Sequence, residues 1–205
     1  QIFAHIKAVE SIAKQDALPF TLKYIVEGEE EIGSPHLGAF IDEHRDLLKC
    51  DFVCNCDAGI HTEDVPAITY ALRGLAYFEL EVRSATKDLH SGLFGGSIHI
   101  PAQALCELIA GMHDANGRVT LPGFYDNVRA LDREERDAIS KLPYSDDDWK
   151  AMTGAHALWG EKGYSTLERI GARPTLEVNG ILSGFTGEGS KTVLPAKAMA
   201  KVSTR

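Results

Sequence analysis

The first third of the chain carries two hydrophobic periods in alternation. Apolar positions recur every three or four residues near the N-terminus and predict a helix over residues 2–15. Runs that contain Val and Ile then predict strands over about 21–27 and 51–56, with a second helix over about 35–48 between them. Helices that alternate with strands in this way favour the α/β fold class with a mostly parallel sheet.

The hydrophobic period changes after the stretch "PAITYALRG". In the next stretch, "LAYFELEVRSA", the side chains of Phe78, Leu80 and Val82 fall on one face, and mainly polar side chains fall on the other. This alternation is typical of a half-exposed antiparallel strand. We therefore expect one domain over residues 1–73 and a second domain over residues 74–205.

The second domain is expected to be an antiparallel sheet with helices on one face. The pattern predicts a helix over about 101–114, a short strand in "GRVTL", and strands in "PTLEVNGI" and "TVLPAKAMAKVSTR". The polar segment over about 124–172 has helical spacing, and we interpret it as an insertion.

The stretch "YIVEGEEEIGSPHL" places four glutamates within five residues, directly after the first predicted strand. One interpretation is a solvated acidic loop before a helix with Ser34 as its N-cap and Pro35 as its first residue. The other is a catalytic site, because neighbouring carboxylates repel each other unless a cation or a proton is present. Position favours the second interpretation, since both "VEGEEE" and "CDAG" follow predicted strands, where parallel sheets carry their chemistry.

Composition narrows the classes of partner. The 205 residues are 44% hydrophobic and carry a formal net charge of −9, which gives a sequence pI near 5.3. An acidic chain without a basic patch is a poor match for nucleic acid or for an anionic membrane surface. No run of eighteen apolar residues is present. We therefore expect no nucleic-acid partner and no membrane partner.

The cysteines are Cys50, Cys54, Cys56 and Cys106. Three of them lie in "CDFVCNCD", whose spacing is neither that of a Cys-x-x-Cys motif nor that of a usual zinc knuckle. We interpret the cysteines as buried free thiols. Such thiols suit a reducing compartment, and we expect the protein to be cytoplasmic.

Five blocks in a fixed order give the sequence a family resemblance. They are "EGEEEIGS", "CDAG", "PAITYALRG", "KDLHSGLFGG" and "GSKTVLPAKAMAKVSTR". Together they resemble the M20 family of dinuclear-metal peptidases and amidohydrolases, and most of all its dipeptidase branch. The resemblance implies part of a catalytic α/β domain over residues 1–73. It also implies a lid domain over residues 74–205 that carries the contact of a homodimer.

The resemblance assigns roles to three acidic residues. The family pattern Glu-Gly-x-Glu-Glu-x-Gly-Ser implies that Glu30 is the general base and Glu31 a metal ligand. Asp57 in "CDAG" matches the ligand of a second metal ion, although Ala58 stands where relatives often have a polar residue. The implied cofactors are two divalent metal ions, zinc or manganese.

The resemblance also assigns roles to three residues of the second domain. His90 matches a histidine that the lid of one subunit presents to the active site of its partner, where it stabilises the oxyanion. Thr192 and Arg205 match positions that bind substrate, and an Arg guanidinium is a natural partner for the terminal carboxylate of a dipeptide. Without the resemblance, His90 would be an ordinary loop histidine and Arg205 a surface cation.

The implied activity is hydrolysis of the peptide bond of a dipeptide or small peptide by a metal-activated water. Two alternatives stay open. The first is an N-acyl amino acid amidohydrolase or desuccinylase of the same superfamily, which would differ in its substrate pocket. The second is a chain without catalytic activity that acts only as a dimerising lid module.

Several ligand blocks of the family have no counterpart in the sequence. They are a His-x-Asp block, an Asp-Asp-Lys-Gly block and a late histidine, while the remaining histidines of the chain match no ligand position. We therefore interpret the chain as a fragment of a longer enzyme. On its own it is expected to bind no metal pair and to hydrolyse no dipeptide.

Overall fold

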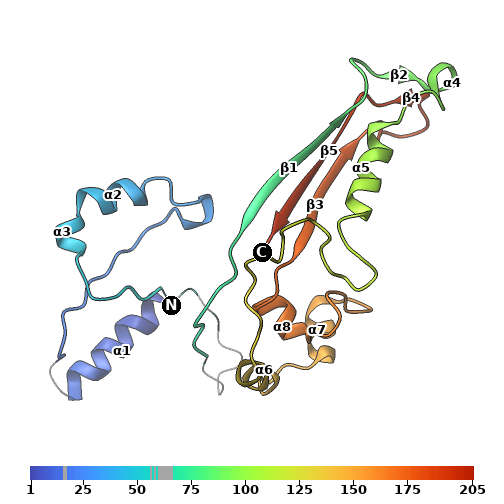
Figure 1. Ribbon diagram of the computed structural model, residues 1–205. Helices are drawn as coiled ribbons and strands as arrows, with labels where there is room; N and C mark the ends of the chain where they lie inside the picture. Colours follow the sequence, from blue (N-terminus) through green and yellow to red (C-terminus); the bar gives the residue numbers. More distant parts are fainter. Residues whose placement is uncertain (16–17, 56, 58, 60–66) are drawn as a thin grey trace. The chain divides into compact units, whose positions relative to one another are not determined.

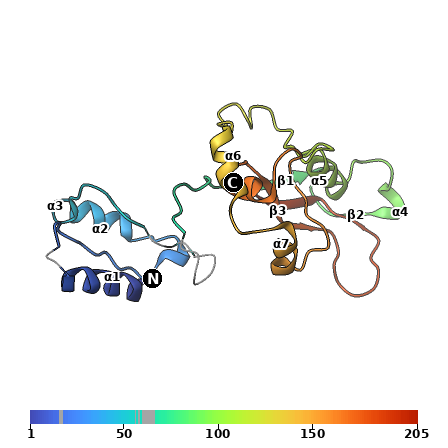
Figure 2. The same cartoon turned by 90° about the horizontal axis from the view of Figure 1, so that it is seen from below.

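The computed structural model describes residues 1–15, 18–55, 57, 59 and 67–205. These residues form two compact units, Gln1–Ile68 and Thr69–Arg205, which are described separately. Figures 1 and 2 show that the first unit contains α1, α2 and α3, while the second contains the labelled strands and the remaining helices.

The first unit is helical where the sequence predicts helices. The N-terminal helix is confirmed as α1 (Ile2–Gln15), and Glu10 forms ion pairs with Lys7 and Lys14 on its surface. The helix expected over 35–48 is divided into α2 (Leu37–Glu43) and α3 (Arg45–Leu48). The division lies at His44, whose backbone is not helical (φ −112°, ψ 23°).

The two strands predicted in the first unit are wrong for the described residues. Residues 21–27 and 51–55 lie in irregular backbone, and residue 56 lies outside the described part. A parallel strand requires a neighbour that supplies hydrogen-bond partners, and no described segment of this unit supplies one. The apolar side chains of these runs are exposed as a result, with Val53 at 84%.

The cysteine prediction is also wrong where the structure tests it. Cys50, Cys54 and Cys106 are exposed rather than buried, and Cys56 lies outside the described residues. The buried strand in which Cys50 and Cys54 were expected is absent. The two residues instead flank the irregular run 51–53. Cys106 lies at an exposed position of α5 (Pro101–Ala110).

An antiparallel sheet forms the centre of the second unit, as predicted. Its strands β1 (Ala76–Arg83), β5 (Lys197–Thr204) and β3 (Leu176–Ser183) lie in the order β1-β5-β3. A second, two-stranded sheet pairs β2 (Leu89–His90) with β4 (Val193–Leu194). Both sheets are antiparallel, so the described residues contain no parallel pairing.

Helices cover one face of this sheet and fill the predicted insertion. The helix expected over 101–114 is α5, which ends at Ala110 and packs against β1, β5 and β3. The short strand expected in "GRVTL" is wrong, because only an isolated bridge between His113 and Val119 forms there. The other helices are α4 (Ser91–Phe94), α6 (Arg133–Ser140), α7 (Asp146–Thr153) and α8 (Thr166–Gly171).

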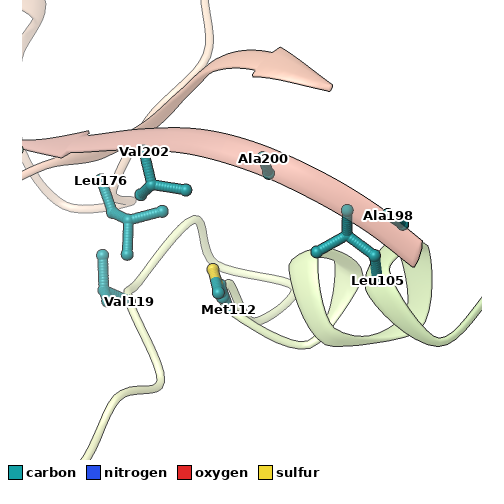
Figure 3. Packing of buried hydrophobic residues seen from close by; sticks show 7 residues of the cluster. All are labelled: Leu105, Met112, Val119, Leu176, Ala198, Ala200 and Val202. Carbon is teal, nitrogen blue, oxygen red and sulfur yellow. The ribbon is translucent and has the colours of Figure 1, made fainter. Parts of the chain in front are cut away.

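The hydrophobic core lies between β5 and α5. Figure 3 shows Ala198, Ala200 and Val202 on the face of β5 that meets Leu105 of α5. Leu105 and Ala200 are fully buried, and Leu80 and Val82 of β1 pack against the same cluster. The opposite face of the sheet carries ion pairs such as Lys201 with Glu79. The alternation predicted for residues 76–83 is therefore confirmed at Leu80 and Val82, whereas Phe78, predicted on the same face, is 51% exposed and lies outside the core.

A buried ion pair attaches the insertion to the sheet region. Arg173 donates from both Nε and a terminal nitrogen to the Glu161 carboxylate, at 2.8 and 3.0 Å, and its side chain is 6% exposed. The guanidinium groups of Arg118 and Arg173 lie against the Tyr125 ring, with the Arg118 carbon 3.8 Å from the ring centroid. The Arg173 guanidinium and the Glu161 carboxylate therefore satisfy each other's hydrogen-bonding groups inside the fold.

A second pair joins two helices of the insertion. Arg136 of α6 donates to both carboxylate oxygens of Glu168 in α8, at 2.6 and 3.2 Å. Glu168 also accepts the backbone N–H of Ser165 as part of a capping box at the start of α8. Burial raises the pKa of Glu168, but the hydrogen bonds from Arg136 and Ser165 outweigh it, so the pKa lies below the ordinary value.

Within the described residues, no helix is both long enough and apolar enough to cross a membrane. The longest helix whose bounds are given, α1, has 14 residues and carries charged side chains.

Truncation of Leu105 should destabilise the second unit. Leu105→Ala removes a fully buried side chain and leaves a cavity between α5 and β5, so the free energy of unfolding should fall by about 2–5 kcal/mol. Leu108→Ala is the matched control on the same helix, because Leu108 is 50% exposed, and it should cost less than about 1 kcal/mol. Urea denaturation followed by circular dichroism measures both, and equal losses would contradict the core assignment.

Removal of the Glu168 carboxylate should reduce the acid sensitivity of the fold. Because its pKa is lower in the folded state, its contribution is complete above the unfolded-state value near 4.5. That contribution is lost as the pH falls through the folded-state value. The free energy of unfolding of Glu168→Gln should therefore fall less steeply with acidification than that of the unmodified chain. Glu188→Gln, at an exposed loop position, should keep the original slope.

Candidate active site

The acidic loop is folded around a short 3₁₀ helix, Glu30–Ile32. Gly33 (φ 86°) and Ser34 (φ 49°) follow it in left-handed backbone, and the Ser34 hydroxyl donates to the Glu27 carboxylate at 2.8 Å. The prediction of Ser34 as N-cap and Pro35 as first helical residue is therefore wrong. The Ser34 hydroxyl is already used by Glu27, and α2 begins three residues later, at Leu37.

The glutamates of this loop fall into two groups. Glu27 is held by Ser34, and Glu29 pairs with the His36 ring at 2.8 Å, so both support the loop. Within the described part of the chain, the carboxylates of Glu30 and Glu31 make no hydrogen bond or ion pair, and both side chains are exposed. The two carboxylates without a partner are the two to which the family resemblance assigns chemistry.

Asp57 is described although its neighbours in the chain are not. Its backbone N–H donates to the side-chain oxygen of Asn55 at 3.2 Å, and the residue is exposed. Within the described residues, no group of three or more His, Cys, Asp or Glu side chains could hold a metal ion. Carboxylates such as those of Glu31 and Asp57 are nevertheless ligands that zinc and manganese accept.

His90 is fixed by both its backbone and its side chain. It lies opposite Val193 in the β2–β4 pair, and it is the N-cap of α4. Its Nδ1 atom accepts the backbone N–H of Gly92 at 3.0 Å. A nitrogen that accepts a hydrogen bond carries no proton, so in the neutral ring the proton lies on Nε2.

Thr192 lies beside His90 in the fold. The backbone N–H of Ser91 donates to the Thr192 carbonyl at 3.2 Å, which extends the pairing of β2 with β4 by one step. The side chains of His90 and Thr192 are both exposed. The structure therefore brings these two predicted substrate-binding residues together, although 101 positions separate them in the sequence.

Arg205 lies at the opposite end of the sheet. Its backbone pairs with that of Thr175, through hydrogen bonds of 2.9 and 3.1 Å, just beyond the ends of β5 and β3. Figure 1 shows the C-terminus at one end of β5, and β2, β4 and α4 beyond the other end. Because β5 has eight residues, these ends lie roughly 25 Å apart, at about 3.3 Å per residue.

Sequence reasoning did not single out Arg73, a second guanidinium near Arg205. One terminal nitrogen of Arg73 donates to the carbonyl oxygens of Arg169 and Arg173, both at 3.3 Å. Burial and the positive charge of Arg205 lower the pKa of Arg73. Its place in "PAITYALRG" was the available signal, but that block carries no pattern that predicts hydrogen bonds to residues 96 and 100 positions further along the chain.

A family model described as the peptidase dimerisation domain of M20 matches residues 70–205. The chain is 35% identical over 189 residues to the Cys-Gly metallodipeptidase dug1 of Schizosaccharomyces pombe, covering 91% of this chain and 40% of that protein. It is 31% identical over 207 residues to the human Beta-Ala-His dipeptidase, covering all of this chain and 41% of that protein. The chain therefore spans about two fifths of the length of these relatives.

Solved structures agree with the sequence relatives. The crystal structure of human carnosine dipeptidase 1 matches with a TM-score of 0.74 and 31% identity, over all of this chain and 44% of that one. An M20 family metallo-carboxypeptidase from Sulfolobus solfataricus, Sso-CP2, matches with a TM-score of 0.73 and 38% identity, over 87% of this chain and 41% of that one. With a peptidase dimerisation domain over two thirds of its length and this set of relatives, the chain belongs to the M20 family of metallopeptidases.

Proposed function

We propose that this chain is part of a metal-dependent dipeptidase. Residues 1–73 would belong to its catalytic domain, and residues 74–205 would form a lid that also carries the contact of a homodimer. The names of two relatives, a Cys-Gly metallodipeptidase and a Beta-Ala-His dipeptidase, support this activity. The match of residues 70–205 to a dimerisation domain supports the dimer.

One observation carries the proposal furthest. His90 and Thr192 lie at one end of β5, and Arg205 lies at the other, roughly 25 Å away at about 3.3 Å per residue. A dipeptide extends over only about 7 Å, so it cannot touch both ends of the same sheet. Arg205 of one subunit would therefore not share a substrate with His90 and Thr192 of the same subunit, and a site that uses all three residues would draw on two subunits.

Two divalent metal ions, zinc or manganese, would be held in part by Glu31 and Asp57. Both side chains are exposed carboxylates, whose oxygens suit either ion. When bound, the ions would supply an acidified water and a positive charge close to the scissile carbonyl. Glu30, adjacent to Glu31 and without a partner among the described residues, would be free to accept a proton.

The proposed reaction is hydrolysis of an amide bond. Glu30 takes a proton from the attacking water, and the hydroxide oxygen forms a bond with the carbonyl carbon. His90 of the partner subunit donates its Nε2–H to the carbonyl oxygen as negative charge develops there. Glu30 then delivers the proton to the leaving nitrogen, the C–N bond breaks, and a carboxylate and a free amine are released. Arg205 would hold the terminal carboxylate of the substrate through paired hydrogen bonds.

A longer peptide is a second candidate for the substrate. The likeness to a metallo-carboxypeptidase favours a site that takes the C-terminal end of longer peptides. Arg205 suits both substrates, because each ends in a carboxylate. An N-acyl amino acid amidohydrolase would share the same reaction but would accept substrates without a free α-amino group.

The thiols of Cys50 and Cys106 are exposed and form no disulfide, which supports our proposal of a cytoplasmic location.

Substitution of the adjacent glutamates in the complete enzyme tests the catalytic assignment. Glu30→Gln should keep its metal content but lower kcat for Cys-Gly or Beta-Ala-His by about 100-fold or more, the scale of general acid–base catalysis. Glu31→Gln should instead lose metal, as measured by inductively coupled plasma mass spectrometry. Glu43→Gln, on an exposed position of α2, should change neither value. Metal loss in Glu30→Gln with retention in Glu31→Gln would show that the two roles are exchanged.

Mixed dimers test whether His90 acts across the subunit interface. His90→Ala and Glu30→Gln should each be nearly inactive as homodimers, since one donor in an oxyanion site contributes roughly 100-fold or more to kcat. Co-expression should yield heterodimers with one site that combines Glu30 of one chain with His90 of the other, and activity should partly return. Heterodimers isolated by two different affinity tags that stay as inactive as their parents would exclude action in trans.

A further inference from the structure

We propose that Gly92 is the positioning residue of His90: it fixes the protonated nitrogen and the direction of the imidazole. The proposal rests on the proposed function, in which His90 donates a hydrogen bond to the substrate oxygen. It adds a second residue to that role, one that acts through the His90 ring. The argument depends on a hydrogen bond, on the space around Gly92, and on the backbone that holds both residues.

The hydrogen bond selects one form of the ring. The backbone N–H of Gly92 can only donate, so the Nδ1 atom of His90, 3.0 Å away, must accept. A neutral imidazole has one protonated and one unprotonated nitrogen, and Nε2 is therefore the protonated one. Within the described residues Nε2 makes no hydrogen bond, and the His90 side chain is exposed. Nε2–H is thus available as a donor.

The other form of the ring would oppose catalysis. With the proton on Nδ1, the Nε2 atom would present a lone pair to the developing negative charge on the substrate oxygen. That arrangement is repulsive, whereas an N–H donor aimed at the same oxygen is stabilising. In water the two neutral forms exchange freely, so a fixed donor, the Gly92 N–H facing Nδ1, is what holds the ring in the useful form.

The space at Gly92 explains why this position holds a glycine. Its backbone is not among the positive-φ glycines of the described residues, so the conformation itself does not require glycine. A Cβ atom added there would lie 2.9 Å from Cε1 and 3.2 Å from Nδ1 of His90, and apart from the adjacent residues and the backbone of α4 no other described heavy atom comes within 4 Å. The imidazole ring therefore occupies the volume that any side chain at position 92 would need.

The backbone on the His90 side of this contact is held independently of it. Leu89 and His90 pair with β4, and the carboxylate of Asp88 accepts the backbone N–H of Ala196 at 2.9 Å. An added methyl group at position 92 would therefore displace the flexible ring rather than the strand. Alanine also has a higher helix propensity than glycine, so α4 itself should tolerate the change. Gly92→Ala should fold and carry a misdirected His90.

The first test is a nuclear magnetic resonance spectrum of the complete enzyme with ¹⁵N-labelled histidine, at a pH where the rings are neutral. The signals of His90 are identified by their loss in His90→Gln. We expect an unprotonated Nδ1 and a protonated Nε2 in the unmodified chain. In Gly92→Ala, a mixture of both forms is expected. The matched control is Gly171→Ala, where an added Cβ meets no heavy atom within 4 Å, and it should leave the His90 signals unchanged.

The second test measures kinetics in the complete enzyme. Gly92→Ala should lower kcat for a dipeptide by about 10-fold or more, with KM changed less than about twofold, because the donor acts mainly in the transition state. Combined with His90→Ala, it should cause no further loss, since both changes remove the same interaction. Gly171→Ala should retain the original kcat.

The outcomes separate this proposal from the proposed function. An unchanged Nδ1 signal in Gly92→Ala, or a kcat equal to that of the unmodified enzyme, would overturn the role of Gly92. Additive losses in the double variant would overturn it as well, because the two residues would then act independently. If His90→Ala alone keeps full activity, the proposed function of His90 fails, and the spectrum alone decides whether Gly92 fixes the ring.

Discussion

The second unit depends on the pairing of β5 with a neighbour on each side. This central strand satisfies its backbone hydrogen bonds through β1 and β3, and its Ala198 and Ala200 side chains are small enough for α5 to approach closely. Leu105 fills the remaining space. Because β5 is held along both edges and on one face, it acts as a rigid spacer between the two ends of the unit.

This rigid spacer decides which of the predicted substrate-binding residues lie close together. His90 and Thr192 meet at one end, because β2 pairs with β4 directly before β5 begins. Arg205 lies at the other end, near the partly buried Arg73 at the start of the unit and the buried Arg173 after α8. In the proposed function, a site that uses all three residues would therefore draw on two subunits.

The acidic loop shows how a local hydrogen-bond pattern separates similar side chains. Four glutamates carry the same charge, but Ser34 holds Glu27 and His36 holds Glu29. These contacts fix the turn through Glu30–Ile32 and leave the Glu30 and Glu31 carboxylates exposed. The sequence singled out Glu30 and Glu31 through a family pattern. The contacts of Ser34 and His36 add a physical reason why the other two glutamates are occupied.

The elements that depend on neighbours close along the chain could be predicted from the sequence alone. Helical spacing predicted α1, and strict alternation predicted β1 together with its buried face at Leu80 and Val82. The features that depend on partners distant along the chain became visible only in the folded structure. The apolar runs at 21–27 and 51–55 have strand composition but no neighbour to pair with, so they form no strand within the described residues. Likewise, the pairing of β2 with β4 brings Thr192 to His90, and no local signal predicts it. Hydrogen bonds between strands can join residues at any separation along the chain.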